Sequence, residues 1–124
     1  YMFHCCTDTY IALPRLLSNL PYQHDYVGHR CDEGHASGGC GYWLSERAMR
    51  ALCHVPPTPG YEDLWVGRTL AAAGIGLHHD VRYSDGQPTW TKNNHITAHL
   101  SPCTGGFNPE QMFKAHTEYL ECVK

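Results

Sequence analysis

An acidic residue stands at the end of a short aromatic and cysteine-rich run, where it could bind a metal ion. Asp8 lies in the segment 6–10, which reads CTDTY. A carboxylate at the end of a buried strand costs free energy unless a cation or fixed hydrogen-bond donors offset that cost. Its hard oxygen ligands suit Mn²⁺ or Mg²⁺. The commoner use of such an Asp is an Asx-turn that reverses the chain, and this motif alone leaves both interpretations open.

A glycine-rich segment, 36–45 with the sequence ASGGCGYWLS, offers backbone that a ligand could approach closely. Glycines within a strand usually mark such an approach or a β-bulge. Tyr42 and Trp43 supply flat rings of the kind on which sugars stack, although two aromatic rings in the core explain them equally well. Ser37 belongs to no G-x-S-x-G elbow or other nucleophile pattern.

A pair of acids follows the proline-rich segment 56–60 and starts a predicted helix. These are Glu62 and Asp63 in the segment 61–67, YEDLWVG. The positive end of the helix dipole keeps carboxylates ionised at this position. An ionised carboxylate can act as general base toward a hydroxyl, whereas capping of the helix is its commoner role.

Two histidines share one face of a predicted strand. In the segment 95–100, HITAHL, alternation places His95, Thr97 and His99 on the same side. A histidine that faces a cleft could complete a metal site begun by Asp8. A structural histidine held by hydrogen bonds is the alternative.

The elements that must position these segments alternate between strands and helices. The patterns predict strands over residues 1–6, 22–29, 38–44, 75–83 and 95–100. They predict four helices. The first has Pro14 in its first turn, and the second follows the N-cap Ser45. The third runs from Glu62 to about Ala73 with Gly74 as its C-terminal cap, and the fourth starts at Pro109 after the N-cap Asn108. The predicted apolar stripes are Leu13, Leu16, Leu17 and Leu20 in the first helix and Met112, Phe113, His116, Tyr119, Leu120 and Val123 in the fourth. This alternation argues for α/β layering within a single domain spanning residues 1–124.

Composition excludes several classes of protein. Apolar residues make up 42% of the chain and charged residues 17%, a balance that buries a core and is not that of a disordered chain. The net charge of −3, without a Lys/Arg cluster, gives no surface for a nucleic-acid backbone. No apolar run approaches the ~20 residues of a membrane span.

Ten His and seven Cys raise the possibility of a zinc module. The spacing of the cysteines argues against it, because no C-x-x-C occurs. An odd number of cysteines cannot pair completely within one chain. Disulfides and plain buried thiols are both better explanations of these residues than zinc ligation.

The order and spacing of the four motifs resemble those of glycosyltransferase family 31, which includes the β-1,3-galactosyltransferases and Fringe. T-D-T-Y ends a strand, S-G-G-x-G-Y follows about 30 residues later, E-D-x-x-V-G about 20 after that, and I-T-x-H lies in the final strand. The matching stretches run from about Phe3 to Leu100. The pair of S-G-G-x-G-Y and E-D-x-x-V-G is the more specific part of the resemblance.

The resemblance implies the C-terminal half of a GT-A fold, a Rossmann-like mixed sheet with flanking helices. It also implies an inverting transfer of a hexose from a UDP-sugar to a hydroxyl of a glycan or glycoconjugate, forming a β-1,3 linkage with Mn²⁺ or Mg²⁺ as cofactor. Asp63 matches the catalytic base, and Asp8 and His99 match metal ligands. The pocket for the donor sugar and the acceptor would include Ser37, Gly38, Gly39, Tyr42, Glu62 and Trp65.

Two departures from the family pattern shape the expectation. Cys6 and Thr7 stand where the family has its first two acids, which predicts a reduced affinity for the metal. The family's nucleotide-binding half would lie before Tyr1, so residues 1–124 alone are not expected to bind UDP tightly. A catalytically silent carbohydrate-binding or scaffolding homologue is therefore the alternative function, and a His/Cys-rich metal-binding module is a third. The compartment stays open between a secretory lumen and a cytoplasm.

Overall fold

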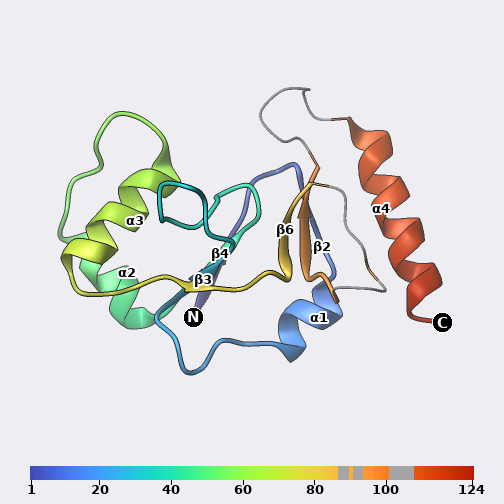
Figure 1. The fold of residues 1–124 in the computed structure, drawn as a ribbon, viewed down its shortest axis with the longest axis horizontal. Helices are drawn as coiled ribbons and strands as arrows, with labels where there is room; N and C mark the ends of the chain where they lie inside the picture. The colour runs from blue at the N-terminus through green and yellow to red at the C-terminus, as the bar shows by residue number, and fades with distance from the viewer. Residues whose placement is uncertain (87–89, 91–93, 101–107) are drawn as a thin grey trace.

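The computed structural model describes residues 1–86, 90, 94–100 and 108–124. Within them the chain forms two small mixed sheets flanked by helices (Figure 1). The predicted α/β class is confirmed at this level. One of the seven cysteines, Cys103, lies outside the described residues. The other six are free thiols.

The first sheet has the strand order β1-β4-β3-β5. Its strands are β1 (Met2–His4), β3 (Tyr26–Gly28), β4 (Tyr42–Leu44) and β5 (His78–His79). Strand β4 runs antiparallel to both neighbours, and β5 runs parallel to β3. Along β4 the side chains alternate, so that Tyr42 and Leu44 face one core while Trp43 faces another.

The second sheet has the order β2-β7-β6. Its strands are β2 (Thr9–Ile11), β6 (Tyr83–Asp85) and β7 (Thr97–His99). Strand β7 is antiparallel to β2 and parallel to β6. Because β7 is central, His99 lies opposite Thr9 on one side and opposite Asp85 on the other.

Four helices accompany the sheets in the described residues: α1 (Leu13–Ser18), α2 (Glu46–Cys53), α3 (Glu62–Ala72) and α4 (Pro109–Cys122). In Figure 1, α2 and α3 lie together at one end of the molecule and α4 lies at the other, with the sheets between them. None of these helices is both long and apolar enough to cross a membrane.

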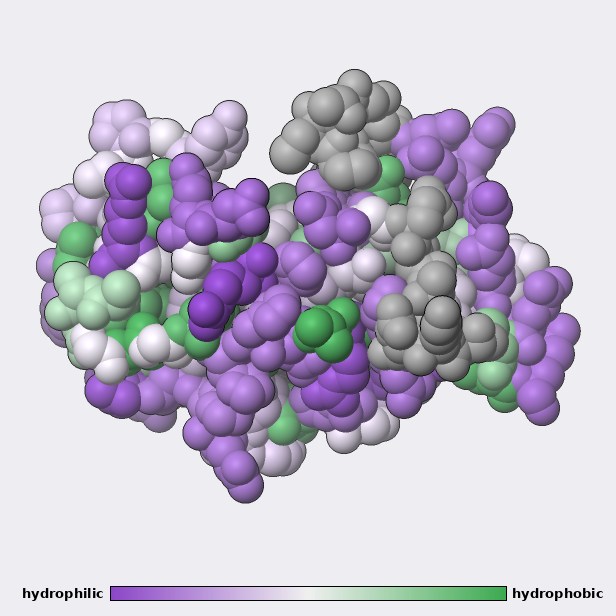
Figure 2. Space-filling model, viewed as in Figure 1, coloured by the Kyte–Doolittle hydropathy of each residue, from purple (hydrophilic) through white to green (hydrophobic). Residues whose placement is uncertain are grey.

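Three buried clusters hold these layers together. One joins α2 and α3 to the first sheet and includes Tyr26, Leu44, Ala48, Val66 and Leu70. A second joins α4 to β2 and β7 and includes Tyr10, Trp90, Ala98, Ala115 and Tyr119. The third lies between the two sheets, where Trp43 donates a hydrogen bond from Nε1 to the hydroxyl of Tyr83 at 2.9 Å. The face shown in Figure 2 is mostly hydrophilic, with hydrophobic side chains in small separate groups.

The helix ends agree with the predictions from local sequence. Ser45 caps α2 through its hydroxyl, which accepts a hydrogen bond from the backbone N–H of Ala48 at 3.1 Å. Asn108 caps α4 in the same way, accepting from Glu110 N at 2.9 Å. Gly74 follows α3 with φ of 72°, the left-handed conformation that favours glycine after a helix.

Three predicted strands differ from the structure. Residues 75–83 contribute to two strands, β5 and β6, that belong to different sheets. The predicted strand 38–44 is a strand only from Tyr42, because residues 38–40 form a turn. The first strand is half-buried, not buried, because β1 lies at the edge of its sheet.

Two predicted apolar stripes also differ. In α1, Leu16 is buried but Leu13 and Leu17 are exposed. In α4, Phe113 from the predicted face is exposed, and Ala115 is buried in its place. In both helices, the buried face is narrower than the predicted apolar stripe. The apolar side chains at the edge of each stripe are therefore exposed to solvent.

Candidate functional site

Sheet pairing brings Asp8 and His99 together. Asp8 directly precedes β2, and its carbonyl oxygen accepts a hydrogen bond from Leu100 N at 3.0 Å. Nε2 of His99 lies 3.3 Å from Oδ2 of Asp8. The other ring nitrogen, Nδ1, lies 3.1 Å from Oδ1 of Asp85. His99 is thus held between two carboxylates, and with Asp8 it forms the acid–histidine pair.

The acid–histidine pair has an acceptor that the protein does not satisfy. Oδ1 of Asp8 is buried and has no hydrogen-bond partner among the described residues. A buried carboxylate oxygen without a donor is costly, and a divalent cation would offset that cost. The described residues contain no group of three or more His, Cys, Asp or Glu side chains placed to hold a metal. Asp8 and His99 would supply only two ligands to a divalent ion, so water or other oxygens would have to fill the remaining positions.

The glycine turn, residues 38–41, packs directly on this pair. A Cβ atom added at Gly39 would lie 2.3 Å from Cε1 of His99, so a side chain there would displace the ring. The turn closes through a hydrogen bond from Gly41 N to Gly38 O at 3.2 Å. Two hydroxyls of the second sheet bond its carbonyls: Thr9 Oγ1 donates to Gly39 O at 2.7 Å, and Thr97 Oγ1 to Cys40 O at 2.5 Å.

The other side of the glycine turn contacts the start of α3. The backbone N–H of Gly38 donates to Oδ2 of Asp63 at 3.0 Å. A Cβ atom added at Gly38 would lie 3.4 Å from this same Oδ2 and 3.4 Å from Oε2 of Glu62. The turn therefore has the two acids of α3 on one side and His99 on the other. Because Gly38 and Gly39 are adjacent, residues predicted from four separate motifs meet at one place.

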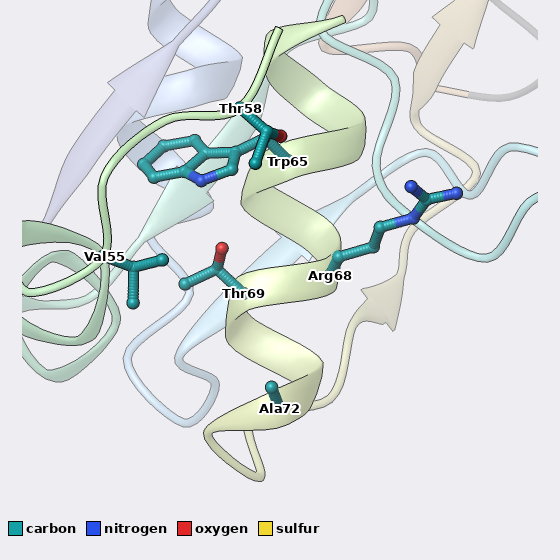
Figure 3. A pocket seen from close by; sticks show the side chains of 6 residues that line it. All are labelled: Val55, Thr58, Trp65, Arg68, Thr69 and Ala72. Carbon is teal, nitrogen blue, oxygen red and sulfur yellow. The ribbon is translucent and has the colours of Figure 1, made fainter. Parts of the chain in front are cut away.

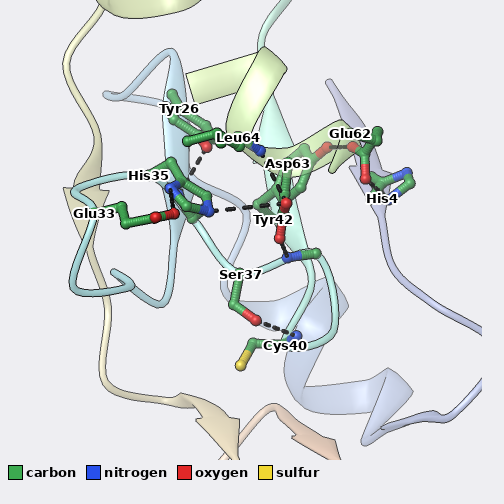
Figure 4. Close-up of polar contacts among 12 residues, drawn as sticks. His4, Tyr26, Glu33, His35, Ser37, Cys40, Tyr42, Glu62, Asp63 and Leu64 are labelled. Carbon is green, nitrogen blue, oxygen red and sulfur yellow. Dashed lines mark hydrogen bonds and ion pairs between the residues drawn. The ribbon is translucent and has the colours of Figure 1, made fainter. Parts of the chain in front are cut away.

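Glu62 is bound by two side chains on the first sheet (Figure 4). The hydroxyl of Tyr42 donates to Oε1 of Glu62, and Nε2 of His4 lies 3.4 Å from Oε2. The ring of His4 stacks on Tyr42 with centroids 4.9 Å apart. Burial, and then the hydrogen bond to Glu62, raise the pKa of Tyr42 far above its ordinary value. The phenol therefore stays protonated and acts as a donor.

Asp63 is fixed at both oxygens. Oδ2 accepts from Gly38, and Oδ1 accepts from the backbone N–H of Leu64 at 2.9 Å. Nε2 of His35 lies 3.8 Å from the same Oδ1. The side chain of Asp63 keeps 23% of its surface exposed, so solvent or a substrate hydroxyl can still reach it.

The two remaining polar positions of the glycine-rich segment serve the turn itself. Ser37 Oγ accepts a hydrogen bond from Cys40 N at 3.3 Å (Figure 4). Burial raises the pKa of the Cys40 thiol to about 12, which makes it an inert core residue. Cys6 is exposed as a residue, but partial desolvation of its sulfur, followed by the charges of Asp8 and Glu62, raises the pKa of its thiol as well. The thiol at the first-acid position is thus a neutral group beside the acids.

Trp65 lies apart from the other predicted site residues. It is two positions from Asp63 on α3, which turns its side chain about 200° around the helix axis. Its indole borders a hollow of about 330 Å³ lined by Val55, Thr58, Trp65, Arg68, Thr69 and Ala72 (Figure 3). Nε1 donates to Pro56 O at 3.2 Å. Among the described residues, the structure therefore does not bring Trp65 together with Asp63 and the glycine turn.

Sequence reasoning missed two histidines of the site, His4 and His35. The signal for His4 was its place in a strand that pairs with the glycine-rich segment, where it faces Tyr42. His35 lies in a segment that reads only as a polar loop, and its neighbour Asp63 is far away in sequence.

No family model matches the chain, and no curated protein matches it at a significant level.

Proposed function

We propose that this chain is the acceptor-side part of a metal-dependent, inverting glycosyltransferase with a GT-A fold. It transfers a hexose from a UDP-sugar to a hydroxyl of a glycan acceptor, forming a β-1,3 linkage. One observation carries the proposal: the glycine turn contacts Asp63 through Gly38 and His99 through Gly39. A candidate base and a candidate metal pair thus flank one short piece of backbone, which supports the proposal.

Asp8 and His99 would hold Mn²⁺ or Mg²⁺ on this proposal. The buried Oδ1 of Asp8, which lacks a donor among the described residues, supports it. The carboxylate of Asp85 beside Nδ1 of His99 orients the ring, as acceptors around metal-binding histidines commonly do. When bound, the divalent ion supplies positive charge that stabilises the departing diphosphate.

Asp63 is the general base of the proposed reaction. Its place at the start of α3 and the hydrogen bonds from Gly38 and Leu64 fix the orientation of its carboxylate. The carboxylate takes the proton of the acceptor hydroxyl while the hydroxyl oxygen forms the new bond to C1 of the donor sugar. The bond from C1 to the diphosphate breaks in the same step, which inverts the anomeric centre.

On this proposal, most of the contacts to the nucleotide would come from residues outside 1–124. The proposed half of a GT-A fold carries the acceptor side, and the described residues show no glycine-rich strand–turn–helix that would bind a diphosphate. The transfer assay therefore uses the longest natural polypeptide that contains residues 1–124, called here the extended polypeptide, with its metal supplied as Mn²⁺.

The Asp63→Asn variant of that polypeptide tests the proposal. The amide keeps the size of the side chain but cannot take a proton from the acceptor. We expect transfer to fall by about 10²-fold or more, while Mn²⁺-dependent binding of UDP stays nearly unchanged. Glu46→Gln, at an exposed position on α2, is the matched control and should transfer normally. Normal turnover by Asp63→Asn would refute the assignment of the base.

A catalytically silent carbohydrate-binding or scaffolding homologue is the second candidate. Cys6 and Thr7 favour it, because they replace two acids of the family pattern, and the raised pKa of Cys6 keeps its thiol from supplying a negative charge. This candidate predicts neither transfer nor hydrolysis of UDP-sugars and no metal-dependent UDP binding by the extended polypeptide. The third candidate, a zinc module, predicts stoichiometric zinc in the purified protein and unfolding on chelation.

A further inference from the structure

A buried histidine, His35, lies between two carboxylates on the side of Asp63 away from the glycine turn. Its side chain is only 8% exposed. Nε2 lies 3.8 Å from Oδ1 of Asp63, and Nδ1 lies 3.9 Å from Oε2 of Glu33 (Figure 4). Nδ1 is buried without a hydrogen-bond partner among the described residues. A polar ring so enclosed costs free energy unless its neighbours are charged.

The backbone around His35 is fixed from three directions. Arg30 and Ala36 form an antiparallel bridge across the loop, and His35 O accepts a hydrogen bond from Cys31 N at 2.8 Å. The next residue donates from its backbone N–H to the hydroxyl of Tyr26 at 2.9 Å. The ring is therefore carried by a closed hairpin and not by a loose loop.

The helix that bears Asp63 packs closely against His35 at a glycine. A Cβ atom added at Gly67 would lie 2.3 Å from Cβ of His35. Only glycine at this position lets the hairpin approach α3 so closely. Gly67 is one turn beyond Asp63 on the same helix, so this close approach sets the ring beside the carboxylate.

We propose that His35 is a positioning residue for Asp63. Its Nε2 faces Oδ1 on the hairpin side at 3.8 Å, longer than a direct hydrogen bond, and the attraction between the two groups keeps Oδ2 beside Gly38. The inference rests on the proposed function, because it gives the orientation of Asp63 a catalytic purpose. If the ring served only to fill space, replacement of either ring nitrogen would have no effect on Asp63.

Two substitutions of similar size separate positioning from packing. Gln places its amide nitrogen near the site of Nε2, facing Asp63, whereas Asn places it near Nδ1, facing Glu33. In the extended polypeptide we expect His35→Asn to lower kcat by about tenfold with little change in KM. His35→Gln should recover most of that loss. Thermal unfolding of both variants checks that they are folded.

A second measurement detects the contact without any transfer. The ¹⁵N signals of the His35 ring are recorded in the 124-residue chain, in Asp63→Asn and in Asp85→Asn. We expect Asp63→Asn to move the Nε2 signal of His35 and Asp85→Asn to leave it in place. An unmoved signal in both would overturn the inference, and so would equal kcat values for His35→Asn and His35→Gln.

The outcomes distinguish failure of the inference from failure of the proposed function. Absence of transfer by the unaltered extended polypeptide refutes the proposed function and removes the catalytic meaning of His35. In that case the ¹⁵N signals of the His35 ring still show whether Nε2 interacts with Asp63. Normal transfer with no difference between the two His35 variants instead refutes the positioning role and leaves the proposed function standing.

Discussion

Replacement of Gly39 by alanine tests the packing of the glycine turn on His99. The new Cβ would lie 2.3 Å from Cε1 and 2.4 Å from Nδ1 of His99. Contacts this short do not occur, so either the ring or the turn must move. The φ angle of Gly39 is not among the positive values in the described chain, and the effect is therefore steric and not a matter of backbone strain.

The ring of His99 cannot move without loss. It is 13% exposed and lies beside Asp8 and Asp85, so a displaced ring leaves two carboxylates without their neighbour. Overpacking of this kind typically costs about 1–3 kcal/mol. For a chain of 124 residues, each kcal/mol corresponds to about 4 °C in the midpoint of thermal unfolding. We expect Gly39→Ala to lower the midpoint by about 4–12 °C.

Two further glycines provide a graded control for this prediction. A Cβ atom at Gly38 would make ordinary contacts, the nearest at 3.4 Å, and one at Gly76 would meet nothing within 4 Å. Thermal unfolding followed by circular dichroism should rank the variants with Gly76→Ala close to the unaltered chain, Gly38→Ala next and Gly39→Ala lowest. If Gly39→Ala unfolds at the same temperature as Gly76→Ala, the turn does not pack on His99 and the reasoning fails.

Two other predictions concern the frame around the site. Ser45→Ala removes the hydroxyl that accepts from Ala48 N and donates to Oδ1 of Asp25, so we expect a loss of at least about 1 kcal/mol in urea unfolding. An equal loss in Ser18→Ala, where the hydroxyl donates to Pro14 O at the last residue of α1, would contradict the capping argument. Burial alone would raise the pKa of Asp80, but hydrogen bonds from Arg82 outweigh it and lower the pKa. A carboxyl with a lowered folded pKa stabilises the protein fully above its unfolded pKa of about 4 and loses that contribution as the pH falls through the folded value. Asp80→Asn should therefore lose less stability than the unaltered chain between pH 5 and pH 2, and identical acid profiles would show that this carboxylate contributes nothing.

Features that depend on neighbours in sequence were predictable. Ser45 and Asn108 cap their helices because a hydroxyl or amide oxygen needs only the next turn of the same helix. Gly74 ends α3 for a similarly local reason. The alternation in residues 95–100 correctly placed Thr97 and His99 on one face, where both contact the glycine turn. It does not extend to His95 and Ile96, because β7 begins at Thr97 and Ile96 packs in a different cluster from Ala98 and Leu100.

Features that depend on partners distant in sequence were not predictable in the same way. Strand β2 has three residues between a turn and a proline, too few to show a period, and exists because β7 pairs with it. The split between β5 and β6 depends on which sheet each half joins, and both halves carry similar residues. The place of His35 could not be predicted from its neighbours in sequence, because it depends on close packing against Gly67 of α3.

The two sheets meet at the glycine turn, and this junction has a mechanical consequence. Asp63 is carried on the side of the first sheet, whereas the acid–histidine pair belongs to the second. Any rotation of one sheet against the other therefore changes the separation between Asp63 and the acid–histidine pair. Thr9 and Thr97 bridge the junction through buried hydroxyls that bond Gly39 O and Cys40 O. These two uncharged side chains thus help to fix the separation between Asp63 and the acid–histidine pair.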